Sequence, residues 1–166
     1  MFDYIHPMIV HFPIALVIVA FATEVTGAIL HREFFYKTAL LLLVLGALGA
    51  IAAYISGNIA GDGVTEAGPL GAALEEHEDA ATLTLWLVII VAVIRTFMAY
   101  KRWMSGWRQW LAVLLLGLSV ASVARTGHLG GQLVFRHAAG VQLDLGFPSS
   151  SNDSSSTTDK KSDDGD

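Results

Sequence analysis

The sequence predicts an all-α protein, a transmembrane four-helix bundle with a disordered C-terminal tail. The chain of 166 residues is 54% hydrophobic and only 15% charged, whereas soluble domains average ~25% charged residues. Four apolar stretches are each long enough to cross a ~30 Å hydrocarbon core as a helix. From Pro148 onward no large apolar residue occurs, so burial cannot offset the entropy of ordering. We expect a transmembrane domain over residues 1–146 and a tail over residues 147–166.

The first helix is expected from Pro7 or Pro13 to Leu30. Proline is tolerated near a helix start, where its missing N–H is not needed. If the helix already begins at Pro7, Pro13 should kink it. No Lys or Arg precedes the apolar run, whereas a cleavable signal peptide opens with a positive segment. The segment is therefore expected to be a retained transmembrane helix.

The second helix is expected from about Phe35 to Ile59. Small residues recur at every fourth position near its end and so fall on one helix face. They are Gly49, Ala53, Gly57 and Gly61. Such a stripe lets another helix, or a flat cofactor, approach the backbone closely. Helix packing is the favoured interpretation.

The third helix is expected from about His77 to Tyr100, after a polar connection over Gly61–Glu76. Four acids surround its start. They are Glu75, Glu76, Glu78 and Asp79. Acids in a first helical turn complement the helix dipole, which is the favoured interpretation of this cluster. A metal-attracting acidic lip is the alternative.

The fourth helix is expected from about Trp107 to Arg125 or a little beyond. Trp103, Trp107 and Trp110 are typical of the membrane–water interface. The glycine-punctuated segment Thr126–Val141 is expected to form a frayed helix end or to lie along the membrane surface.

Positive charge predicts the orientation. Lys and Arg follow the first and third helices, at Arg32, Lys37, Lys101, Arg102 and Arg108. The connection between the second and third helices contains no Lys or Arg. Because basic loops stay in the cytoplasm, both termini are predicted to lie outside, in a multi-pass protein of the membrane.

Five histidines then fall at the outer end, and only His31 at the cytoplasmic end. The five are His6, His11, His77, His128 and His137. Histidine tolerates interfaces and can cap helices, which gives the simplest explanation for any one of them. As a group they are candidate ligands, because ionisable residues at membrane depth are typically functional.

A b-type haem, in an electron-transfer subunit, is the leading hypothesis for this group. The chain has no Cys, which leaves two imidazoles as the available haem ligation. The candidates are His11, His77, His128 and His137, with His6 beside them. His11 and His77 are the first choice, because they begin parallel helices that can lie diagonally in a bundle. Met8 offers a His/Met variant.

Two other interpretations stay open. His6, His11 and His77 could hold Cu or Zn, whose ligands include imidazole. The chain could also be a non-catalytic structural or assembly subunit. No nucleophile–base pair or HExxH element indicates a hydrolase, and no basic patch indicates nucleic acid.

A buried ion pair is predicted near the opposite end of the bundle. Glu24 and Arg95 each lie about six residues before the end of their helices. Those helices run in the same direction, so the two charges should reach the same depth. A charge inside a membrane is tolerated best when it is paired.

Two motifs resemble the family of small bacterial membrane proteins called DUF2231. They are HPMIVHFPIAL at residues 6–16 and TGHLGGQLVFRHAAGV at residues 126–141. Phe135 and Ala138 replace the Tyr and Gly common in the family. The resemblance covers about residues 1–143. It implies a small four-helix protein of the bacterial inner membrane, and it implies no activity. The electron-transfer hypothesis adds other respiratory or redox membrane proteins as expected partners, besides the lipid bilayer.

Overall fold

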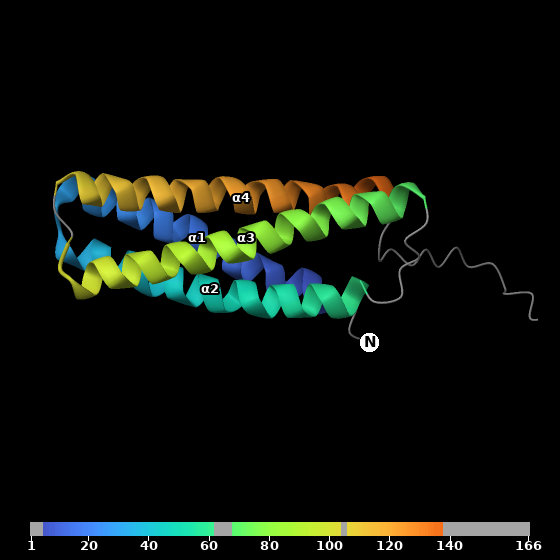
Figure 1. Cartoon of the computed structure of the whole chain (residues 1–166), viewed down its shortest axis with the longest axis horizontal. Coiled ribbons are helices and arrows are strands. Elements are labelled where there is room, and N and C mark those ends of the chain that lie inside the picture. The colour runs from blue at the N-terminus through green and yellow to red at the C-terminus, as the bar shows by residue number, and fades with distance from the viewer. Residues whose placement is uncertain (1–4, 62–67, 104–105, 138–166) are drawn as a thin grey trace, which may run out of the picture.

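The computed structural model describes residues 5–61, 68–103 and 106–137, which form four long helices in a bundle (Figure 1). The helices are α1 (Ile5–Leu30), α2 (Glu33–Gly61), α3 (Pro69–Tyr100) and α4 (Trp107–His137). Each packs against two neighbours, in the order α1–α2–α3–α4 around the bundle, and α4 closes onto α1. Helices α1 and α3 therefore lie diagonally opposite each other. The predicted all-α four-helix architecture is confirmed, while the predicted tail lies outside the described residues.

All four helices are long and apolar enough to cross a membrane. Large apolar side chains such as Ile18, Leu41 and Trp86 point outward and are exposed. The bundle interior is built from small and branched residues, with Val17, Leu43, Val88 and Leu116 almost completely buried. An apolar exterior around a packed interior is the pattern of a bundle in lipid.

The predicted start of the third helix is wrong. Helix α3 begins at Pro69, eight residues before His77. Proline is well suited to a first helical position, and the Ala, Leu and Glu residues that follow are strong helix formers. The four acids at Glu75–Asp79 consequently lie beyond the first turn, so they do not cap the N-terminus of the helix.

The fourth helix also extends further than its minimum prediction. Helix α4 runs through the glycines of Thr126–His137 without a break. Gly130 lies in this extension, at a point where a Cβ atom would lie only 3.0 Å from Cε1 of His77. The glycine allows α3 and α4 to approach closely.

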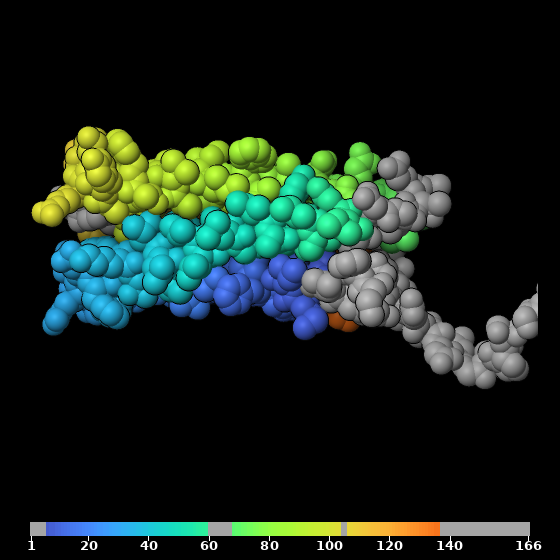
Figure 2. Space-filling model, turned by 90° about the horizontal axis from the view of Figure 1, so that it is seen from below, coloured from blue at the N-terminus to red at the C-terminus, as the bar shows by residue number. Residues whose placement is uncertain are grey.

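The small-residue stripe of α2 packs against α1, as the favoured interpretation held. A Cβ atom on Gly49 would lie 3.2 Å from Cβ of Pro13, and one on Gly46 would lie 3.0 Å from Val17. Pro13 is a buried residue in the interior of α1, and the helix continues on both sides of it. Figure 2 shows α2 lying between α1 and α3 on one face of the bundle.

The connections after α1 and after α3 lie together at one end of the bundle (Figure 1). Because their basic residues should face the cytoplasm, a reporter fused after Arg102 is expected to be active inside the cell. A reporter fused after Gly68 should be active outside. Periplasmic activity of the Arg102 fusion would reverse the orientation.

Candidate cofactor site

Two histidines, His6 and His77, face neighbouring helices at the end of the bundle away from the basic connections. His6 lies in the first turn of α1 and His77 in the third turn of α3. Both side chains are partly buried, and both lie at this same end of the bundle. Helices α1 and α3 are diagonal, so the two imidazoles belong to opposite corners of the bundle.

The His6 ring is held by Ser56 of α2. Its Nδ1 lies 3.0 Å from the Ser56 hydroxyl oxygen, and that hydroxyl donates its proton to the Ala53 carbonyl oxygen at 2.9 Å. A hydroxyl has only one proton to donate, so it accepts a hydrogen bond from His6 Nδ1–H. This arrangement leaves the lone pair of His6 on Nε2, with the ring orientation fixed in the way metal-ligating histidines require.

Glycines set the position of both rings. A Cβ atom on Gly57 of α2 would lie 3.0 Å from Cε1 of His6, and one on Gly130 of α4 would lie 3.0 Å from Cε1 of His77. Each imidazole therefore lies flush against the backbone of the neighbouring helix. Any larger residue at either glycine would push the ring out of place.

His77 carries an unsatisfied ring nitrogen. Its Nδ1 is buried and has no hydrogen-bond partner within the described part of the chain. A buried nitrogen without a partner is costly, and such groups in folded proteins often mark a ligand or functional position. Because Nδ1 lies against Gly130 of α4, Nε2 is the His77 nitrogen that a ligand could reach.

A satisfied hydroxyl network fixes α3 and α4 next to His77. Thr126 donates to the Ala80 carbonyl oxygen at 3.0 Å and lies 2.8 Å from the Thr84 hydroxyl, which also contacts Ser122. With its own proton committed to Ala80, Thr126 accepts from Thr84, and Thr84 accepts from Ser122. This chain of hydrogen bonds restrains the helix segment that carries His77.

The other predicted ligands are either exposed or have side chains outside the described part of the structure. His11 is exposed, and its Nδ1 hydrogen-bonds the Pro7 carbonyl oxygen one turn earlier. His128 is exposed and accepts a hydrogen bond from the Gln132 amide at 2.7 Å. His137 ends α4, and its side chain is outside the described residues. His31 lies at the opposite end, as predicted, in the turn after α1.

No group of three or more His, Asp or Glu side chains that could hold a metal ion occurs in the described ranges. The acids around His77, Glu75, Glu76, Glu78 and Asp79, are all exposed on α3. What this end of the bundle offers a ligand is therefore two partly buried imidazoles, His6 and His77.

The predicted ion pair between Glu24 and Arg95 is confirmed. Arg95 donates from Nη2 to Glu24 Oε2 at 2.9 Å and from Nε at 3.2 Å. The side chains are 2% and 0% exposed. A third contact joins Arg95 Nη2 to the Tyr36 carbonyl oxygen at 3.4 Å, so the pair ties α1, α2 and α3 together.

Ser56, the residue that orients His6, was not predicted from the sequence, and His11 was ranked above His6 as a candidate ligand. The available signal was helical spacing. Five residues at ~100° each turn a helix ~140° past one full turn, so His6 and His11 cannot share a face of one helix. Only one of them can point into the bundle.

Comparison with known proteins identifies one family. Residues 3–143 match the family model described as a predicted membrane protein, DUF2231. No curated protein sequence and no solved structure is significantly similar to the chain.

Proposed function

The chain belongs to the DUF2231 family of membrane proteins, and we propose that it is a b-type haem protein of the membrane that transfers electrons. The haem iron would be held by His6 and His77. The observation that carries this proposal is the pair of partly buried imidazoles at one end of the bundle, on the diagonal helices α1 and α3. Haem in a helical bundle is commonly held by imidazoles from facing helices.

The donor set fits this cofactor. His6 presents Nε2 because Ser56 occupies its Nδ1, and His77 would also bind through Nε2, because its Nδ1 is buried against Gly130 of α4. Two imidazoles suffice for the two axial positions of a haem iron. A structural zinc site needs four protein ligands and a catalytic one three, so the pair favours haem over zinc.

The protein's own residues would orient the two ligands. Ser56 fixes the His6 ring, and the hydroxyl network of Thr84, Ser122 and Thr126 restrains the helix that carries His77. Bound haem supplies one-electron chemistry, and its potential depends on the axial ligands and their hydrogen bonds. The His6–Ser56 hydrogen bond would therefore tune the potential.

The test is the optical spectrum of protein purified in mild detergent from haem-replete cells. We expect a coloured protein whose reduced-minus-oxidised difference spectrum has the sharp bands of low-spin, bis-histidine haem. Haem and metal content should be measured on the same sample, with about one haem per chain expected. Colourless protein that takes up no added haem would refute the proposal, and stoichiometric copper or zinc would favour metal binding in its place.

A further inference from the structure

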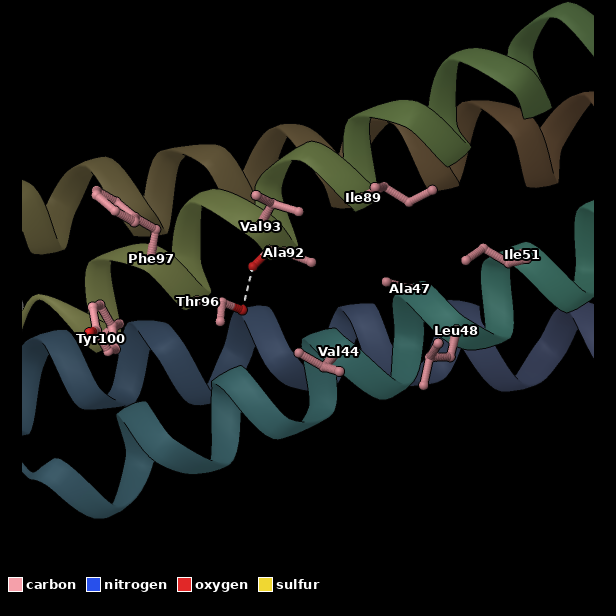
Figure 3. A pocket seen from close by; sticks show the side chains of 10 residues that line it. All are labelled: Val44, Ala47, Leu48, Ile51, Ile89, Ala92, Val93, Thr96, Phe97 and Tyr100. Carbon is pink, nitrogen blue, oxygen red and sulfur yellow. Dashed lines mark hydrogen bonds between the residues drawn. The ribbon is translucent and has the colours of Figure 1, made fainter.

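An apolar groove runs between α2 and α3 on the lipid-facing surface of the bundle (Figure 3). Its volume is about 550 Å³. Side chains from α2, including Val44 and Leu48, form one wall, and side chains from α3, including Val93 and Phe97, form the other. The groove opens sideways into the space that lipid occupies, so its occupant comes from the membrane.

The length of the groove matches one leaflet. On α3 it extends from Ile89 to Tyr100, a span of ~16 Å at ~1.5 Å per residue. Half of a ~30 Å hydrocarbon core is ~15 Å. The groove therefore covers the depth of a single acyl chain, from the bilayer midplane to the headgroup level.

The groove wall offers almost nothing polar. The side chain of Thr96 places a hydroxyl inside the groove, and this hydroxyl donates to the Ala92 carbonyl oxygen at 2.7 Å (Figure 3). Tyr100 stands at the mouth, largely exposed. A polar head deeper in the groove than Tyr100 would find no free donor there, whereas a hydrocarbon chain needs none.

A cation stands at the mouth of the groove. Nζ of Lys101 lies 5.8 Å from the ring centroids of both Phe97 and Tyr100, which belong to the groove wall. Lys101 makes no ion pair within the described residues, in contrast to Lys37, whose Nζ lies 3.0 Å from a Glu33 oxygen. The uncompensated ammonium is held near the level expected for lipid headgroups.

We propose that this groove binds the acyl chain of an anionic phospholipid whose phosphate pairs with Lys101. A second copy of the chain fits less well. The outward-facing side chains of a second copy's helices are largely apolar and would offer no anion to Lys101, whereas a single acyl chain is a narrow occupant whose headgroup brings a phosphate. The charge at the mouth selects an anionic headgroup over a zwitterionic one.

The experiment is native mass spectrometry of the full chain released from nanodiscs that contain equal amounts of phosphatidylglycerol and phosphatidylcholine with identical acyl chains. Wild-type protein should retain phosphatidylglycerol about fivefold more than phosphatidylcholine, the factor that ~1 kcal/mol per lysine near an anionic surface gives. Lys101→Gln should bring that ratio close to one. Lys37→Gln, which removes a charge already paired with Glu33, should leave the ratio high.

A second pair of variants tests the groove itself. Val44 lines the groove and is partly exposed, so Val44→Phe should fill it and lower retention of both lipids. Val19→Phe, at an exposed position on α1 outside the groove wall, should retain both lipids like the wild type. Equal retention of the two lipids by the wild type, or unchanged retention in Val44→Phe, would overturn the proposal. Dimers lost in Val44→Phe would assign the groove to a second copy and would also overturn it.

Discussion

Replacing Glu24 or Arg95 alone by alanine is expected to lower the free energy of unfolding by ~3–5 kcal/mol, the cost of leaving a buried charge without its partner. Both side chains are almost completely inaccessible. Arg95→Ala leaves a carboxylate inside the bundle, and Glu24→Ala leaves a guanidinium that has lost both of its hydrogen bonds to Oε2. The double variant removes both charges, so its loss should be clearly smaller than the sum of the two single losses.

Denaturant titration in detergent micelles, followed by circular dichroism, measures the four free energies of this double-mutant cycle. The exposed pair Glu33–Lys37 serves as a matched control, because an exposed i,i+4 pair contributes only ~0.3–0.5 kcal/mol. Additive losses at Glu24 and Arg95 would show that the two charges act independently, against the geometry described above.

The existence of the helices and the ion pair could be predicted from the sequence because both depend on strong, local signals. A run of apolar residues of membrane-spanning length has few alternatives to a helix in lipid. When parallel helices carry a single acid and a single base at equal depth, each charge has few other partners with which to form an ion pair. Glu24 and Arg95 were therefore predictable without knowledge of the helix rotations.

The start of α3 was not predictable in the same way. The residues Pro69–Glu76 are less apolar than the rest of the helix, and a search for membrane-spanning stretches treats such a segment as a loop. Helix propensity decides the outcome, because a proline at the first position and the Ala, Leu and Glu that follow favour helix even beyond the apolar run. The acids near His77 were consequently assigned to the wrong turn.

Which histidines form the candidate site depends on the rotation of each helix about its axis, and the sequence did not determine that rotation. With α1 expected to begin at Pro7 or Pro13, His6 lay outside or at the very edge of the helix and was ranked below His11. The helix in fact begins at Ile5, so both histidines are helical and must point in different directions. Packing of α1 against Ser56 and Gly57 of α2 then decides which one faces inward.

His6→Ala and His77→Ala are each expected to abolish the low-spin haem spectrum, while His11→Ala and His31→Ala should leave it unchanged. His11 is the informative control, because it is only five residues from His6 and shares its helix and its end of the bundle, yet is exposed. His31 controls for loss of any imidazole at the far end. The measurement is the reduced-minus-oxidised spectrum per chain, with size-exclusion chromatography and circular dichroism to verify that each variant folds.

Two further measurements separate a ligand from a residue that only supports the fold. Added imidazole should restore part of the low-spin spectrum to His6→Ala and His77→Ala, since a small ligand can fill the place of the missing side chain. Ser56→Ala should keep the haem but shift its midpoint potential, because it removes the hydrogen bond to His6 Nδ1 that tunes an axial ligand. A spectrum that survives His6→Ala but is lost in His11→Ala would contradict the assignment and show that α1 presents its other histidine to the cofactor.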